Sequence, residues 1–595
     1  MPASVRRSRP LLLLSIAAMV SGPAAPLASR ALSGSTVSAP ESPVRCMRGE
    51  AGYQPRFPVA APPPSPPVSY DIAAAPEEDS QDIIVTSQRI APSQQSSPIA
   101  VTAVTAGQAE QRAVKAQAAY PVAVAEDRER YRGKDVAGIF AVAQQPVSTF
   151  SIDVDTGSYA NVRRFLTQGQ TPPEAAVRTE EMLNYFRYDY PLPADRSRPF
   201  SVTTDMAMTP WNPDTRLLRI GIKGFDIPRE QRPAANLVFL VDVSGSMDEP
   251  DKLPLVKSAL AMLADKLTPR DKVSIVVYAG AAGIVLEPTS NANYVKAALD
   301  CLQAGGSTAG GQGMELAYAT ARAHFIPGGV NRVIMATDGD FNVGISSDEG
   351  IEAIVKKNRE SGITLTTLGF GQGNYNEAMM EHVADVGNGN FAYIDSALEA
   401  QKVLDEEMAA TLFTIAKDVK IQIEFNPALV REYRLIGYEN RALAEEDFDN
   451  DKVDAGDIGA GHQVTALYEL VPAGAKGWLP ARHFEDNRPA AASPRSGSDL
   501  AWLKLRYKLP DGDRSMLIER PVPAALAASA QAPRGDLAFA SAVAAFGQKL
   551  RGDKYLGSFS YADIRRLAGD QHGYLREEFL KLTGLAGKGQ VASAE

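Results

Sequence analysis

Four strongly apolar runs alternate with amphipathic segments through the middle of the chain. They are NLVFLVDV from Asn236, KVSIVVYA from Lys272, RVIMATDG from Arg332 and ITLTTLGFG from Ile363. The segments between and after them have the apolar spacing of helices, at 253–267, 294–302, 313–325, 350–359 and 377–386. Continuous Val, Ile and Leu runs separated by helices predict a doubly wound α/β fold, a mostly parallel sheet covered on both faces. Ligands bind such sheets at the carboxyl ends of the strands.

Strands without intervening helices are predicted on both sides of this α/β region. NFAYI and GIVLEP add strands to its own sheet, the second as an edge or hairpin strand. Residues 147–232 combine a helical start with alternating apolar strands, and five β-like segments follow residue 414. We expect these two β-rich regions to form one composite sandwich, followed by a pair of C-terminal amphipathic helices.

The N-terminus has the pattern of an export signal. Arg6, Arg7 and Arg9 precede the apolar run LLLLSIAAMV, which is too short to span a bilayer, and small residues follow. No lipobox cysteine follows, and no later run is apolar enough to be transmembrane, so we expect an exported chain in the periplasm or cell envelope. The predicted boundaries are a signal peptide at 1–31, a disordered Pro/Ala/Ser-rich linker at 32–146, an N-terminal region at 147–232, the α/β domain at 233–413, a β-rich region at 414–530 and helices at 531–595.

Within the linker, the β-prone segment DIIVTSQR runs from Asp82 to Arg89. It resembles the TonB box, a peptide that joins a partner's sheet as an added strand. A chance β-branched octapeptide is the alternative. A TonB-type partner would make the chain an envelope component coupled to TonB-dependent transport.

Charge and cysteine content narrow the class of protein further. The formal net charge of −10 argues against nucleic-acid binding, which requires Lys and Arg to neutralise phosphates. The two cysteines are Cys46, in a low-complexity stretch, and Cys301, in the apolar-periodic stretch YVKAALDCL. We expect Cys301 to be a small buried side chain and the chain to contain no structural disulfide.

Small oxygen-bearing side chains gather in three loops at the predicted strand ends. The first loop carries Asp242, Ser244 and Ser246, the second is GGSTAGGQG with Thr308, and the third carries Asp338. Alternation along the first loop points its i, i+2 and i+4 side chains in a common direction. Carboxylates and hydroxyls without His or Cys suit a hard octahedral cation such as Mg²⁺.

This set, Asp-x-Ser-x-Ser followed by Thr and Asp on later loops, resembles the metal-ion-dependent adhesion site (MIDAS) of von Willebrand factor type A (VWA) domains, which are Rossmann-like. The resemblance implies that Ser244 and Ser246 bind the ion directly and Thr308 directly or through water. Asp242 and Asp338 would act through water. It further implies Mg²⁺, Mn²⁺ or Ca²⁺ as the ion, and a protein partner whose acidic residue fills the open coordination position.

The flanking regions extend this resemblance. FSIDVDTGSYANVRRFL, VRTEEMLNYFRYDYP, GFGQGNYNEAMMEHVADVGNGNFAYID and RLIGYENRAL are similar to a family of exported bacterial VWA proteins. Members of that family carry a conserved N-terminal region and a C-terminal β/helical region of unknown role. The similarity runs from Val147 to the C-terminus.

Several polar residues near the motif have simpler interpretations. Asp and Ser are ordinary helix caps, so the first loop alone is a weak signal. We expect Asp248, Glu249 and Asp251 to form the solvated first turn of the following helix, where its dipole favours them. Asp340 is a candidate for orienting a metal-bound water.

Catalytic interpretations find little support in the sequence. A nucleophilic Ser244 needs a general base, and the candidates His324 and His382 fall in helical segments. DVSGS lacks the Gly-x-Ser-x-Gly elbow, GFGQGN departs from the dinucleotide-binding pattern and GGSTAGGQG has no P-loop lysine. We therefore predict a non-enzymatic, metal-dependent interaction module, with a metal-dependent hydrolase as a further alternative. The export signal disfavours a chaperone-like partner of a cytosolic ATPase.

Overall fold

The computed structural model describes residues 129–592 apart from 132, 153–154, 307–309, 340–347, 408–409, 411, 481–497 and 511. The predicted signal peptide, Cys46, the segment from Asp82 to Arg89 and nearly all of the linker lie outside the described residues. None of the helices in the described part of the chain is both long and apolar enough to cross a membrane.

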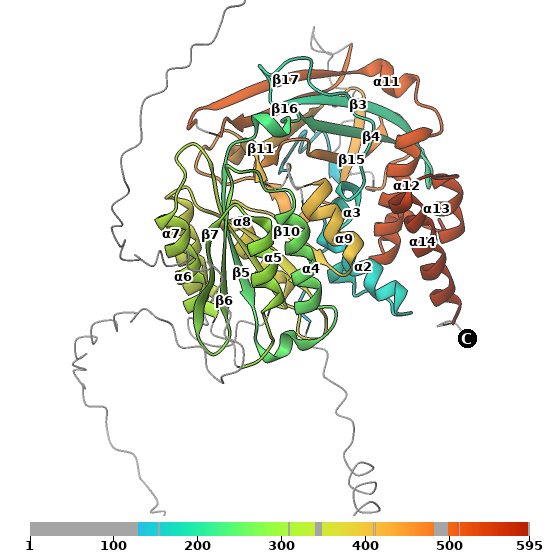
Figure 1. The fold of residues 1–595 in the computed structure, drawn as a ribbon. Coiled ribbons are helices and arrows are strands. Elements are labelled where there is room, and N and C mark those ends of the chain that lie inside the picture. The colour runs from blue at the N-terminus through green and yellow to red at the C-terminus, as the bar shows by residue number, and fades with distance from the viewer. Residues whose placement is uncertain are drawn as a thin grey trace, which may run out of the picture. The chain divides into compact units, whose positions relative to one another are not determined.

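The predicted α/β fold is confirmed, with the strand order β10-β9-β8-β5-β6-β7 in one six-stranded sheet (Figure 1). Its strands are parallel except β7, which is the antiparallel partner of β6 at the sheet edge. The strands are β5 (Ala235–Asp242), β6 (Lys272–Tyr278), β7 (Ala282–Thr289), β8 (Val330–Thr337), β9 (Thr364–Phe370) and β10 (Phe391–Ile394).

Helices cover both faces of this sheet, as the continuous apolar strands predict. Alternation along β5 sends Leu237 and Phe239 into the core on one face and Val238 and Leu240 into the core on the other. Helices α4 and α5 pack on the first face, and α6, α7 and α8 on the second. Their bounds are α4 (Leu253–Ala264), α5 (Ala292–Asp300), α6 (Gly310–Ala323), α7 (Asp348–Arg359) and α8 (Glu377–Val386), and the short α9 (Ala397–Gln401) and π-helical η4 (Lys402–Glu406) follow β10.

Two antiparallel sheets combine strands from before and after the α/β unit, which confirms the composite sandwich. Their strand orders are β1-β12-β15-β4-β3 and β13-β2-β11-β16-β17, with β14 paired to β11. Aromatic side chains pack between them, for example Phe150 against Tyr468 at 6.2 Å between ring centroids. The strands are β1 (Phe140–Ala141), β2 (Val147–Ser151), β3 (Phe200–Thr209), β4 (Asn212–Gly224), β11 (Thr414–Phe425), β12 (Val430–Ile436), β13 (Ala442–Leu443), β14 (Ile458–Gly459), β15 (Gln463–Pro472), β16 (Asp499–Lys508) and β17 (Ser515–Pro523).

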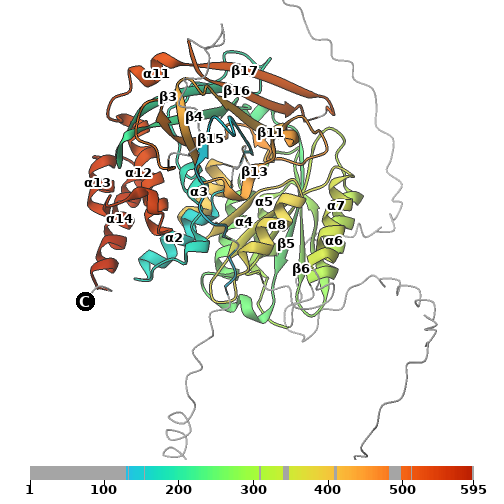
Figure 2. The same ribbon diagram turned by 180° about the vertical axis from the view of Figure 1, so that it is seen from behind.

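The C-terminal region contains three main helices where a pair was expected. The second predicted helix is divided at Gly569 and Gly573, whose φ angles of +65° and +89° do not continue a helix. These helices lie beside α2 and α3 in both views (Figures 1 and 2) and pack on them through an aromatic core. The three main C-terminal helices are α12 (Gly535–Leu550), α13 (Tyr561–Ala568) and α14 (Tyr574–Ala592), and the short α11 (Ala524–Ala528) precedes them. The two helices that they contact are α2 (Gly157–Thr167) and α3 (Thr179–Asn184).

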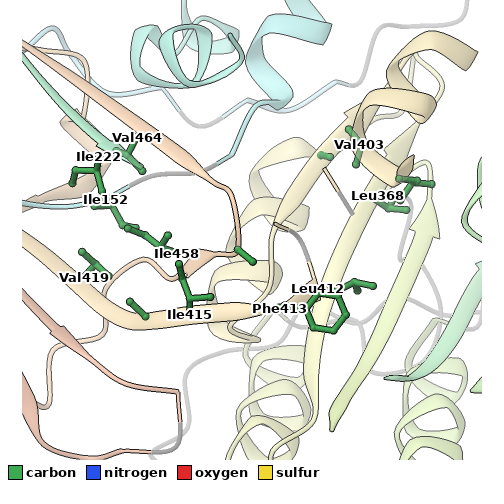
Figure 3. Close-up of a cluster of buried hydrophobic side chains, with 14 of the residues drawn as sticks. Ile152, Ile222, Leu368, Val403, Leu412, Phe413, Ile415, Val419, Ile458 and Val464 are labelled. Carbon is green, nitrogen blue, oxygen red and sulfur yellow. The ribbon is translucent and has the colours of Figure 1, made fainter. Parts of the chain in front are cut away.

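The apolar core is continuous between the sandwich and the α/β unit. Leu412 and Phe413 lie where the chain leaves the α/β unit, and Ile415 and Val419 on β11 extend the same cluster toward Ile458 (Figure 3). All five side chains are at most 6% exposed. The sandwich and the α/β unit therefore share one core.

Cys301 contradicts the prediction that the chain has no disulfide. It is exposed at the C-cap of α5 and is disulfide-bonded. The buried face of this helix consists of Val295, Ala298 and Leu299, and the cysteine lies outside it. The apolar spacing identified the helix correctly but did not put Cys301 on its buried face.

Buried ion pairs join α2 to distant parts of the chain. The Arg163 guanidinium on α2 bonds to Asp395 after β10, to Glu399 on α9 at 2.7 Å and to Glu578 on α14 at 3.1 Å. The side chains of Arg163 and Glu399 are 7% and 1% exposed. One guanidinium therefore holds carboxylates from three separate segments together.

We expect Arg163→Met to lower the free energy of unfolding by about 3–5 kcal/mol, because it leaves these carboxylates buried without their cation. Arg566→Met is the matched control, since Arg566 is 76% exposed and pairs only locally with Asp563, and it should cost less than about 0.5 kcal/mol. Urea unfolding of the full chain measures both. Equal stability of the two variants would contradict the role given to Arg163.

Candidate metal centre

The first loop of the candidate site begins where β5 ends, at the carboxyl edge of the sheet. Asp242 is the last residue of β5 and is fully buried, and Ser244 is 1% exposed. A 3₁₀ turn, η3 (Gly245–Asp248), follows and carries Ser246, whose hydroxyl lies 3.0 Å from that of Ser244. The alternating positions of the motif thus bring the two hydroxyls side by side above a buried carboxylate.

Both carboxylate oxygens of Asp242 accept hydrogen bonds. Oδ1 accepts from the backbone N–H of Ser244 at 2.9 Å, and Oδ2 accepts from the Thr337 hydroxyl at 2.9 Å. Thr337 is the last residue of β8 and immediately precedes Asp338, which is also fully buried. The hydrogen bond from Thr337 therefore links the first and third loops of the predicted motif.

Asp338 has two partners that the sequence analysis did not identify. Its Oδ2 accepts from the Lys252 ammonium at 3.1 Å and from the Asn374 side-chain amide at 3.1 Å. Lys252 is the N-cap of α4, and Asn374 lies in the GFGQGN loop after β9. Both come from loops at the same sheet edge, but a single lysine at a helix start has no distinguishing sequence signal.

The second loop approaches the first through its backbone. The N–H of Gly245 donates to the carbonyl of Gly306 at 3.0 Å, and the N–H of Gly305 donates to the carbonyl of Val243 at 2.8 Å. Thr308 and Asp340 themselves lie outside the described residues, so their predicted roles remain predictions.

The expected role of the nearby acidic residues is wrong in one respect. Asp248 and Glu249 are exposed, as predicted, but α4 begins only at Leu253 and has no acidic residue in its first turn. Pro254 near the helix start suits the first turn because it needs no N–H there, and it sets this later beginning. Asp248 therefore ends η3 and Glu249 follows it, so neither belongs to α4.

The electrostatics of the site favour a bound cation. The pKa of Asp242 is raised to about 6, chiefly by burial and also by the charge of Asp338, whereas the hydrogen bond from Ser244 opposes the shift. Two buried carboxylates close enough to repel each other are stabilised by a divalent cation between oxygen donors. No three His, Cys, Asp or Glu side chains of the described residues come together as a metal cluster, so such an ion would depend on the serine hydroxyls.

The two histidines considered as bases for Ser244 both lie in or beside helices away from it. His324 directly follows α6, at the helix end away from the loop with Gly305 and Gly306. His382 lies within α8 and contacts Glu352 on α7 at 3.4 Å. Neither imidazole contacts Ser244, whose hydroxyl instead contacts that of Ser246.

Comparisons with known proteins identify the family of the chain. The family model for the von Willebrand factor type A domain matches residues 236–407, and a model described as the C-terminal region of the uncharacterized protein YfbK matches residues 410–588. A third model, described as von Willebrand factor, matches residues 125–219. The chain is thus a VWA-domain protein, of a class whose members are typically metal-dependent protein-interaction modules.

The chain is 49% identical over 470 residues to the protein described as "Uncharacterized protein YfbK" from Escherichia coli K12, covering 77% of this chain and 81% of that one. It belongs to the YfbK family. A UPF0353 protein from Mycolicibacterium vanbaalenii is 29% identical over 201 residues, which are 30% of this chain and 59% of that protein.

Similar solved structures include a von Willebrand factor type A protein from Catenulispora acidiphila, 16% identical, with 67% of this chain and 91% of that chain covered and a TM-score of 0.36. Another is proximal thread matrix protein 1 from the mussel byssus, whose MIDAS motif is occupied by zinc. It is 23% identical, with 31% of this chain and 46% of that chain covered and a TM-score of 0.25.

Stability without metal should depend on pH through Asp242. The pKa of Asp242 is raised to about 6 in the folded chain, so the folded state binds a proton at this carboxyl more tightly than the unfolded state does. The resulting contribution to the free energy of unfolding is present below about pH 4 and is lost as the pH rises through 6. In EDTA, the wild type should therefore lose about 2–3 kcal/mol between pH 4 and pH 7.5 relative to Asp242→Asn.

Chemical unfolding of both proteins at the two pH values measures this difference. Mg²⁺ at pH 7.5 should restore stability to the wild type and have little effect on Asp242→Asn. Parallel pH profiles for the two proteins would show that Asp242 is not the titrating group.

Proposed function

We propose that the chain is an exported, non-enzymatic interaction module that binds the carboxylate of a protein partner through a divalent cation. The observation that carries this proposal is the arrangement around Asp242, with both of its oxygens accepting hydrogen bonds beneath the paired hydroxyls of Ser244 and Ser246. Mg²⁺ is the proposed ion, with Mn²⁺ and Ca²⁺ as alternatives, because the donors are all hard oxygens.

The residues of the site divide into two groups in this proposal. Ser244, Ser246 and Thr308 would hold the ion directly, while Asp242 and Asp338 would balance its charge through bound water. Mg²⁺ readily keeps part of its water shell, which leaves a position for the partner's carboxylate. The ion would supply the attraction for the partner's carboxylate, and the chain's own residues would fix where the ion sits.

The surroundings of the site indicate what kind of surface the partner presents. Asp248 and Glu249 are exposed and follow Ser246 by two and three residues, so a partner's acidic residue would meet two negative charges near the site. A partner whose carboxylate is surrounded by Lys and Arg would meet complementary charge here, whereas a uniformly acidic surface would be repelled. We therefore propose an acidic residue within a basic surface as the recognised feature.

Export is part of the proposal because of the N-terminal pattern of basic, apolar and small residues. The disulfide at Cys301 fits an oxidising compartment such as the periplasm, since disulfides persist there.

Ser244→Ala tests the metal-binding step directly. We expect it to weaken Mn²⁺ binding at least about tenfold, because altering even the partners of metal ligands typically costs that much. Ser258→Ala is the matched control, since the Ser258 hydroxyl is exposed on α4 and bonds only to the carbonyl of Pro254. Isothermal titration of the metal-free full chain with Mn²⁺ gives the affinities.

The same three proteins test the partner step. Immobilised on a resin and exposed to envelope extract, the wild type and Ser258→Ala should retain a common set of proteins in Mg²⁺ and release it in EDTA. Ser244→Ala should retain none of that set. Retention that is indifferent to both EDTA and Ser244→Ala would refute the proposed function.

A further inference from the structure

Lys252 places a positive charge inside the candidate metal centre. Its side chain is 7% exposed, and its ammonium lies 3.1 Å from Asp338 Oδ2 and 3.1 Å from Asn374 Oδ1. The amide of Asn374 also donates to the same Asp338 oxygen at 3.1 Å. Asp338, Lys252 and Asn374 thus form a closed triangle of contacts on the predicted metal-site carboxylate.

The surrounding loop holds the lysine in place. Gly371 has a φ of +74°, and a Cβ atom at this position would lie 2.3 Å from Cε of Lys252, so the aliphatic stem lies directly against the glycine backbone. The hydroxyl of Tyr393 donates to the carbonyl of Gly371 at 2.7 Å. The N–H of Gly373 donates to Glu129 at 2.9 Å. Because the loop is anchored at these points, the ammonium has a fixed position.

This fixed charge changes the charge balance of the site. At neutral pH the carboxylates of Asp242 and Asp338 and the ammonium of Lys252 together carry one net negative charge. A bound divalent cation would leave the site with one net positive charge, which matches a single partner carboxylate. Without the lysine, the cation would be fully neutralised by the two aspartates, and the attraction for a further carboxylate would be weaker.

We propose that Lys252 is a fixed counter-charge that weakens cation binding and strengthens the binding of a carboxylate to the bound cation. This inference rests on the proposed function. Lys252 acts through Asp338 and is therefore a positioning residue. Its removal should change the two affinities in opposite directions, which the loss of a purely structural contact would not do.

Lys252→Met tests the proposal because it removes the charge and keeps an unbranched stem against Gly371. Lys252→Gln is a second neutral variant, and Lys252→Arg retains the charge. Lys296→Met is the matched control. Lys296 pairs with Asp265, the C-cap of α4, so it lies near the other end of that helix, about 20 Å from Lys252 along the axis. Its loss changes the net charge equally.

Two titrations of the full chain at pH 7.5 provide the readouts. Electron paramagnetic resonance of free Mn²⁺ gives the cation affinity. Acetate is titrated into the Mn²⁺-loaded protein to give the carboxylate affinity. Each acetate that binds displaces metal-bound water, which lowers the relaxation rate of the water protons. Acetamide, which is uncharged, controls for nonspecific effects, and thermal unfolding confirms that each variant is folded.

We expect both neutral variants to bind Mn²⁺ about tenfold more tightly than the wild type, because a unit charge a few ångströms from a divalent ion has at least that effect even in water. They should require about threefold more acetate, because the lysine acts on a singly charged carboxylate with half that energy at the same distance. Lys252→Arg and Lys296→Met should behave like the wild type. Unchanged or weaker Mn²⁺ binding by a folded neutral variant would overturn the inference and leave the proposed function intact. Failure of the wild type to bind Mn²⁺ would refute both.

Discussion

The buried carboxylate of Asp242 is the constraint around which the candidate site is arranged. It ends the central strand β5, between β6 and β8, where burial removes its charge from bulk solvent. Its oxygens therefore accept from the nearest donors, the Ser244 N–H and the Thr337 hydroxyl. These two hydrogen bonds hold the β5 loop against the end of β8 and so bring Ser246 and Asp338 to the same edge of the sheet. The positions of the other donors follow from satisfying this one buried group.

The regions flanking the α/β unit orient it through buried charges. Arg178, just before α3, bonds to Glu377 on α8 at 2.9 Å, and the amide of Asn161 on α2 donates to the same carboxylate at 2.7 Å. The guanidinium of Arg441, after β12, lies 3.8 Å from the carboxylate of Glu381 on α8. Buried ion pairs contribute little net stability, but a misaligned arrangement would leave charges unpaired at a large cost. These contacts therefore favour a single orientation of the α/β unit relative to the sandwich.

The sequence predicted the fold where the signal was local and missed features that depend on distant contacts. Periodicity located every strand of the α/β sheet, and the motif predicted that Asp242, Ser244, Ser246 and Asp338 lie at one edge of it, because its spacing follows from the strand geometry. The sequence analysis missed Thr337, Lys252 and Asn374. These residue types have no distinguishing pattern, and they contact the two aspartates only because the loops after three strands meet at one edge of the sheet. Similarly, Cys301 lies within an apolar pattern, and only the helix's packing shows that it faces outward. The break between α13 and α14 depends on the left-handed backbone of Gly569 and Gly573, which glycine permits but does not dictate.

The region before the α/β unit also covers one edge of its sheet. Strand β10 is the last in its sheet, so the outward backbone groups of Phe391 have no strand partner within that sheet. The carboxylate of Asp155 accepts the Phe391 N–H at 3.0 Å, and α2 packs over the strand so closely that a Cβ at Gly157 would lie 2.3 Å from the Phe391 ring. Unpaired edge strands are sites of aggregation in proteins, and covering them with a helix is one of the established remedies. The segment before the α/β unit therefore protects this edge as well as contributing strands to the sandwich. This requirement gives a structural reason for the VWA unit to sit inside the chain, between the two halves of the sandwich.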